Sequence, residues 1–291
     1  MAATESLRRG DLQAALKELK DEVRAKPQDA ASRIFLFQLF AISGEWERAQ
    51  SQLNVSGQLD PAAELMVQAY TEAIRCERLR AEIFAGKRTP LVLGEPDQWV
   101  ALLLQSLAIR ASGQTDAAER LREQAYEAAP TISGTIRWRQ SGQSGDEVVA
   151  AEPFEWLADA ELMLGPVLET LLDGRYYWVP LKQIRSVRIE PPTDLRDLVW
   201  LPAQFTWVGG GQQLGFIPTR YIGSENDPDD AVRLARKTYW LADAEGGEVG
   251  RGQRLLATDI SEYPLLDVRE IDFDPVPGAG PLAEGDKTVD G

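Results

Sequence analysis

Apolar residues in the first 130 positions recur at helical spacing. Between Leu12 and Val23 they return every three or four residues, which predicts a helix that begins after an N-cap at Asp11. The next predicted helix, near residues 29–42, contains FLFQLF and is apolar nearly all round, so we expect it to be covered on two sides. The same pattern predicts further helices at residues 46–53, 62–84, 98–111 and 115–128.

A 34-residue repeat runs through these helices. The positions Gly10, Ala15, Leu19 and Pro27 reappear as Gly44, Ala49, Leu53 and Pro61, each 34 residues later. This is the period of a tetratricopeptide-type helix pair, and a fainter copy follows at Gly113, Ala118 and Pro130. Stacked helix pairs leave a concave face that holds a segment of another protein, so the repeat predicts a binding role.

Beyond residue 173 the pattern changes to short β-type runs separated by turn signals. These runs are YYWVPL, IRSVRIE, LVWLP, QFTWV, QLGFIP, RKTYWL, RLLATD and LLDVREIDF. They predict an antiparallel sheet or a small barrel with an aromatic core. The preceding segment, residues 154–173, reads as helical in part, with a break at Gly165-Pro166. The predicted fold class is therefore α+β, with helical repeats followed by a smaller β-rich domain.

Four regions follow from these patterns. Residues 1–130 form the helical repeat domain, and residues 131–152, rich in Ser, Gly and acidic residues, form a linker or a hairpin insertion. Residues 153–274 form the β-rich domain. Residues 275–291, rich in Pro, Gly and acid, read as a disordered acidic tail.

Charge and composition exclude several classes of function. The net charge of −15 is carried mostly by the residues after 130, so nucleic acid and anionic membrane are unfavourable partners. Histidine is absent, which removes the commonest general base and the imidazole metal ligand. The lone Cys76 lies on an apolar helical stripe and is interpreted as a core thiol. No targeting segment or spanning run is visible, so a cytoplasmic location is expected.

Two groups of residues could carry chemistry. Glu155, Asp159 and Glu161 lie close together in sequence and could supply carboxylates for acid–base catalysis or a metal site. Charges at the start of a helix explain them more simply, and we favour that interpretation. The glycine cluster at residues 209–211 lacks the helix and Lys-Ser/Thr pair of a phosphate loop, so it is interpreted as a hairpin turn.

Aromatic and arginine residues in the β-rich half are candidates for a contact surface. Tyr176, Tyr177 and Trp178 are consecutive, so they cannot all face one side of a strand, and at least one is expected at the surface or an interface. Arg196, Trp200, Arg220 and Tyr221 belong to residue types that dominate interfaces. Ion pairs within the domain are the simpler interpretation of the arginines.

The second half resembles a known family. FEWLADAELMLGPVLE, GRYYWVPLKQIRSVRIE, DLRDLVWLPAQFTW, IPTRYIGSE and LLATDISEYPLLDVREI together are similar to the ImpE family, also called TagJ, of bacterial type VI secretion loci. The stretches FLFQLF, GEWERAQSQL and AYTEAIRCERLRAEIFAGKRTPLVLGEP extend the resemblance toward the N-terminus. Relative to that family, residues 141–152 and the acidic tail read as additions.

The resemblance implies a non-enzymatic cytoplasmic adaptor without a cofactor or metal. Its expected partner is the small subunit of the contractile sheath, bound through a helix or an extended segment, and an AAA+ ATPase that recycles the sheath is an indirect partner. From helices expected to line the concave face we select Arg33, Phe37, Gln38, Gln68 and Arg75 as contact residues. A self-associating scaffold and a carboxylate-based enzyme or metal protein remain alternatives.

Overall fold

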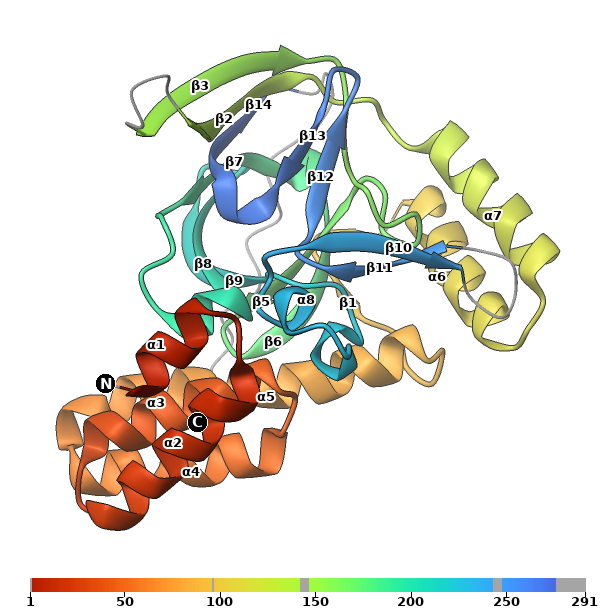
Figure 1. The fold of residues 1–291 in the computed structure, drawn as a ribbon. Helices are drawn as coiled ribbons and strands as arrows, with labels where there is room; N and C mark the ends of the chain where they lie inside the picture. Colours follow the sequence, from red (N-terminus) through yellow and green to blue (C-terminus); the bar gives the residue numbers. More distant parts are fainter. Residues whose placement is uncertain (1, 96, 142–146, 243–247, 276–291) are drawn as a thin grey trace, which may run out of the picture.

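The computed structural model describes residues 2–95, 97–141, 147–242 and 248–275. In Figure 1 helices α1–α5 gather below the strands, and α6 and α7 lie apart from them, beside the sheet. The helices are α1 (Ala2–Arg8), α2 (Leu12–Ala25), α3 (Ala30–Ile42), α4 (Trp46–Leu59), α5 (Glu64–Phe84), α6 (Gln98–Ala111), α7 (Thr115–Ala128) and the short α8 (Asp230–Arg233).

Local sequence signals explain where these helices begin and end. The Asp11 carboxylate accepts a hydrogen bond from the Ala14 N–H at the start of α2, as predicted, and Asp29 caps α3 in the same way. The turns at Gly10, Gly44 and Gly113 have φ values of +81°, +67° and +80°, a region that favours glycine. Each of these glycines follows a helix and precedes the next one, so the repeated glycine marks the same turn three times.

Most strands form one large sheet. Its members are β1 (Leu91–Val92), β2 (Gly134–Ser141), β3 (Glu147–Phe154), β5 (Val167–Leu172), β6 (Arg175–Pro180), β7 (Ile184–Ile189), β8 (Trp200–Trp207), β9 (Gln212–Pro218) and β14 (Val268–Phe273). Within the described residues their order is β1-β6-β5-β9-β8-β7-β14-β2-β3, antiparallel except for the β1–β6 pair. The two end strands do not pair with each other there, so the sheet is open and the expected barrel is not closed.

Smaller strands complete the β half. β4 (Leu157–Asp159), β12 (Leu255–Thr258) and β13 (Glu262–Pro264) form a second sheet with β12 in the middle, and β10 (Thr238–Ala242) pairs with β11 (Glu248–Gly252). The helical prediction for residues 154–173 is wrong, because this segment contributes β4 and β5. Every residue of β5 is buried, including Glu169 and Thr170, so its sequence VLETLL lacks the alternation of apolar and polar positions that would distinguish a strand from a helix.

The region between residues 131 and 152 joins the sheet. β2 pairs with β3 and also with β14, so these two strands, on either side of residues 142–146, are built into the fold at one end of the sheet. The expected disordered tail, apart from residue 275, lies outside the described residues.

The two halves of the chain share a hydrophobic core. One cluster of buried side chains contains Phe37 and Tyr70 from the helices together with Trp178 and Trp200 from the sheet. A second cluster fills the opposite face of the sheet, where Phe205 stacks on Trp207 at 5.3 Å between ring centroids. Because side chains alternate along a strand, the sheet packs its own core on one face and the helices on the other.

Candidate functional site

The inner helices of the repeat region are covered by the chain's own sheet. Phe37 and Gln38 on α3 are buried, at 0% and 6% exposure, and the Phe37 ring lies 5.7 Å from that of Tyr70 on α5. The Tyr70 ring in turn lies 5.6 Å from Trp200 of β8. The face that was expected to form an open groove is therefore filled from within the molecule.

The other three residues selected for that groove are less covered. Arg33 is half-buried and donates to the Pro27 carbonyl at 2.8 Å and to Gln52 at 2.9 Å. Arg75 is exposed but donates to the Gly174 carbonyl, at the turn between β5 and β6, at 2.9 Å. Gln68 is exposed on α5. The five residues thus do not share one open surface.

The aromatic residues of the β half are mainly core residues. Tyr176, Trp178 and Trp200 are buried in the cluster shared with the helices. Tyr177 points to the other face of the sheet and packs, half-buried, against the second cluster. The alternation expected for a strand is present, but both faces are covered, so none of the consecutive aromatic residues is fully exposed.

The candidate arginines of the β half hold the molecule together. Arg220 is buried and donates to the Ile42 carbonyl at 2.9 Å, which links the sheet side to the end of α3. Tyr221 is also buried, and its hydroxyl accepts from the Leu255 N–H at 2.9 Å. Arg196 is half-buried, with its guanidinium 4.9 Å from the Tyr70 ring centroid and 3.3 Å from Asp194. These contacts fit the simpler interpretation of the arginines, in which they bind groups within the protein.

A buried ionic cluster lies between α5 and the strands. The Arg80 Nε and Nη2 atoms donate to the two Glu169 carboxylate oxygens at 2.6 and 3.0 Å. Arg254 bridges Glu169 and Asp159, and all of these side chains are nearly or fully buried. Glu77, 3.4 Å from Arg80, accepts from the Trp200 indole N–H at 3.1 Å. Ion pairs thus connect residues 85 and 89 positions apart in sequence.

Two buried carboxylates in this region have pKa values shifted in opposite directions. Burial by itself raises the pKa of Glu169, but the guanidinium groups of Arg80 and Arg254 outweigh it and lower the pKa to about 2. For Glu161, burial outweighs the hydrogen bond from the Gly250 N–H and raises the pKa to about 7. One Glu161 oxygen accepts from the Gly250 N–H at 2.8 Å, whereas the other has no partner among the described residues.

These contacts correct the interpretation of the carboxylates near residue 159. They are not helix-start charges, because Asp159 ends β4, and Glu155 and Glu161 flank that strand outside any helix. Asp159 is engaged by Arg254, and the described residues contain no group of three or more Asp, Glu, His or Cys side chains suited to a metal ion. The arrangement supplies ion pairs that join elements of the fold.

Two smaller features have structural roles. Cys76 is buried, and burial raises the pKa of its thiol to about 12, so the thiolate form that reacts is strongly disfavoured. The glycine cluster at residues 209–211 forms the turn between β8 and β9, with Gly210 at φ +89°.

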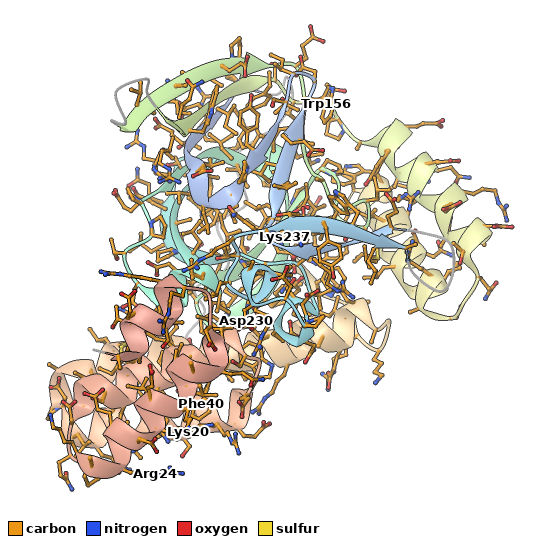
Figure 2. All side chains as sticks on the ribbon, viewed as in Figure 1. Lys20, Arg24, Phe40, Trp156, Asp230 and Lys237 are labelled. Carbon is orange, nitrogen blue, oxygen red and sulfur yellow. The ribbon has the colours of Figure 1, made fainter. Side chains whose placement is uncertain are left out.

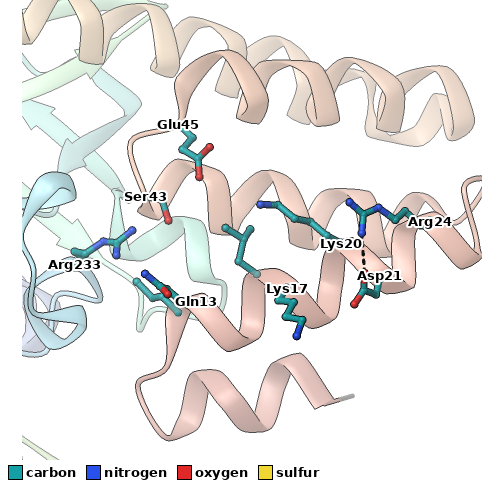
Figure 3. Close-up of a pocket in the computed structure, with 10 residues that line it drawn as sticks. Gln13, Lys17, Lys20, Asp21, Arg24, Ser43, Glu45 and Arg233 are labelled. Atoms are coloured by element: carbon teal, nitrogen blue, oxygen red, sulfur yellow. Dashed lines mark hydrogen bonds and ion pairs between the residues drawn. The ribbon is translucent and has the colours of Figure 1, made fainter.

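A groove open to solvent lies along α2. Leu12, Ala15, Leu19 and Val23 bury one face of this helix, which leaves Gln13, Lys17 and Arg24 exposed on the other. The groove encloses about 420 Å³ and is lined by α2 residues together with Ser43, Glu45 and Arg233. Figure 3 shows Lys20 and Arg24 projecting from α2, with Glu45 across from them and Arg233 at the end of the groove.

Contacts from α8 hold one end of this groove in place. The Leu12 N–H donates to Asp230 at 2.9 Å, and the same carboxylate group pairs with Arg233 at 3.0 Å. Arg236, just beyond α8, donates to the Leu7 carbonyl at 3.0 Å. The β half therefore fixes the start of α2 and places Arg233 beside it.

The groove is positively charged in an acidic protein. Its lining contains Lys17, Lys20, Arg24 and Arg233 against Asp21 and Glu45. Both acidic groups are engaged, Asp21 by Arg24 at 2.8 Å and Glu45 by Arg48. Lys17 and Lys20 form no ion pair within the described part of the chain. The Lys20 ammonium lies 5.3 Å from the centroid of the Phe40 ring, which forms an aromatic contact beneath it.

Sequence reasoning missed this groove. Lys17, Lys20 and Arg24 are spaced three and four apart, the spacing that places side chains on one face of a helix. That spacing was a usable signal, but Glu18, Asp21 and Glu22 are interspersed with it. The contribution of Arg233, more than 200 residues away, has no local signal.

Known proteins resemble this chain over nearly its whole length. Residues 151–272 match the family model described as ImpE protein. The chain is 50% identical over 275 residues to the type VI secretion system accessory component TagJ of Pseudomonas aeruginosa, covering 94% of this chain and 92% of that one. The crystal structure of protein VPA1032 from Vibrio parahaemolyticus has the same fold, with a TM-score of 0.79 at 24% identity, covering 94% of this chain and 98% of that one. In the described residues, no helix has the length and apolar character that crossing a bilayer requires.

Proposed function

The chain belongs to the ImpE family, and we propose that it is a non-catalytic, cytoplasmic accessory component of type VI secretion that binds a sheath component. The observation that supports this proposal is the 50% sequence identity to TagJ over 94% of the chain. The partner is the small sheath subunit, and binding assists sheath assembly or recycling, which makes an AAA+ recycling ATPase an indirect partner.

The binding site in this proposal is the groove along α2. Because the expected concave face is filled by the sheet, the partner binds where the helix pairs remain open. The 34-residue period and the recurring glycine turns support a tetratricopeptide-like character of the helix pairs. Helical repeats of this kind hold helices of other proteins in grooves.

Charge complementarity defines the face of the partner. Lys17, Lys20 and Arg24 follow one another at the spacing of successive helical turns. An amphipathic helix with carboxylates at the same spacing places carboxylates near Lys17 and Lys20, which form no ion pair in the described residues, while Leu16 in the groove lining offers apolar contact. The remaining acidic surface of the protein repels such a helix from other sites.

No specific observation favours the two alternatives, a self-associating scaffold and a carboxylate-based enzyme or metal protein. The aromatic strand proposed as a self-association contact has Tyr176 and Trp178 in the core. The carboxylates proposed for catalysis include Asp159, which is held by Arg254.

Titration calorimetry tests the proposal with the full-length chain and a synthetic N-terminal helix of the small sheath subunit from the same locus. The shared core makes separate halves unsuitable, because division would expose Trp178 and Trp200. The double variant Lys17→Glu/Lys20→Glu is expected to bind at least about tenfold more weakly, since two attractions become repulsions.

Lys87→Glu/Arg120→Glu is the matched control, because both side chains are exposed and neither lines the groove. This control is expected to bind within about twofold of the parent. If both double variants weakened binding equally, the groove would not be the binding site. If the parent chain did not bind the helix, the small sheath subunit would not be the partner.

A further inference from the structure

A second cleft lies at the other end of the molecule from the α2 groove. It encloses about 400 Å³ between the end of α7, the segment that follows it, and β4. Its lining is mostly apolar and includes Ala129, Pro130, Ile132, Trp156, Leu157, Leu162 and Pro166. Figure 2 shows Trp156 near the top of the molecule, far from Lys20 and Arg24 at the bottom. The two sites are therefore separate surfaces.

Large apolar side chains in this cleft face solvent. Trp156 is 40% exposed and Leu162 is 43% exposed, and both line the same cleft. Trp156 lies in the connection between β3 and β4, and the next residue, Leu157, is buried. Exposed apolar residues that gather around one hollow mark an interaction site.

The cleft also runs along the free edge of a sheet. β4 is an end strand, paired only with β12 in the three-stranded sheet of the described residues. The Ala160 N–H donates to the Leu255 carbonyl, so Ala158 and Ala160 face β12, and the main-chain groups of Leu157 and Asp159 face the opposite edge. The Asp159 N–H is bonded to the Gly165 carbonyl at 2.7 Å. The Leu157 N–H and C=O thus point away from β12, while Leu157 as a whole is only 5% exposed.

The charge of the cleft indicates the chemistry of its occupant. Glu262 lies in the lining and is exposed, and the described lining residues include no Lys or Arg. Glu155 and Asp259 add further acid next to Trp156, and the Glu155 N–H donates to the Asp259 carboxylate at 2.8 Å. An occupant with basic side chains is therefore favoured, the reverse of the α2 groove.

We propose that this cleft binds an extended, basic segment of a protein partner. An apolar side chain of this segment packs between the exposed Trp156 and Leu162, and a lysine or arginine pairs with Glu262 at the rim. The inference does not depend on the proposed function, because it uses a different surface and a partner of opposite charge.

The test uses the full-length chain and an acetylated, amidated hexapeptide of alternating leucine and lysine as the probe, followed by calorimetry. The parent chain is expected to bind this probe, and Trp156→Ala is expected to weaken binding at least about tenfold, because an aromatic anchor is lost. Glu262→Lys is expected to weaken binding by a similar factor through charge repulsion. The counterpart peptide of leucine and glutamate is expected not to bind.

Matched controls separate the cleft from general attraction between a cationic peptide and an acidic protein. Leu214→Ala removes an apolar side chain that is 74% exposed on β9, and Glu47→Lys reverses a charge on α4 whose side chain is 85% exposed. Both controls are expected to bind like the parent. Equal binding by Trp156→Ala and the parent, equal weakening by Glu47→Lys and Glu262→Lys, or no binding at about millimolar peptide would each overturn the proposal.

Discussion

The buried ionic cluster and the α2 groove contain the same kinds of side chains in opposite surroundings. In the cluster, Arg80 and Arg254 meet Glu169 out of contact with water. In the groove, Lys17 is exposed and Lys20 is half-buried, and neither has a carboxylate partner in the described residues. Charges that are buried must be paired, whereas exposed charges in a groove are free to meet another molecule. Burial therefore separates charges that maintain the fold from charges suited to binding.

Removing the central charge of the cluster is expected to have the largest effect. Glu169→Gln leaves Arg80 and Arg254 buried with too little compensating charge, so the free energy of unfolding is expected to fall by about 3–5 kcal/mol at pH 7. Urea denaturation followed by circular dichroism measures this change. Glu47→Gln is the control, because its exposed pair with Arg78 is expected to contribute at most about 1 kcal/mol. Similar losses of unfolding free energy in Glu169→Gln and Glu47→Gln would contradict the difference expected between buried and exposed ion pairs.

The next effect depends on pH and on Glu161. The folded pKa of about 7 lies above the ordinary value of 4.5, so the charged form is disfavoured in the folded protein. Below pH 4.5 the group is protonated in both states and the shift has no effect. As pH rises from 4.5 through 7, folding opposes ionisation, and the parent chain loses stability relative to a neutral variant.

Glu161→Gln is therefore expected to gain stability over the parent between pH 4.5 and pH 8, reaching roughly 3 kcal/mol at the upper end. Denaturation measured across that range checks the result, with Glu47→Gln as the exposed control. A constant difference between Glu161→Gln and the parent at all pH values would show that the Glu161 pKa is not raised.

The smallest effect is expected at the exposed groove. Raising the salt concentration from about 50 to about 500 mM is expected to weaken binding of the sheath helix roughly fivefold, because exposed charges are screened. In Lys17→Gln/Lys20→Gln the loss is expected to shrink to about twofold, since fewer charges remain to be screened. Calorimetry at each salt concentration measures both values. An unchanged salt dependence in the variant would place the electrostatic contact elsewhere.

Local signals in the sequence determined much of the helical half. The period of apolar residues placed α2, α3, α6 and α7, and Asp11 was identified as an N-cap from its side chain and position alone. These features depend on residues within a few positions of each other, so the chain carries them before it folds. The acidic composition and the resemblance to the ImpE family were also readable without coordinates.

Only the tertiary structure decided which helix and strand surfaces are covered and which are open to a partner. The sheet packs against the helices, so Phe37 and Trp178 became core residues, and β5 forms a strand although its apolar and polar positions do not alternate. Glu169 meets Arg80 from 89 positions away, and Arg233 reaches the groove of α2 from the far half of the chain. Such contacts depend on how distant segments pack, and a pattern confined to neighbouring residues does not contain that information.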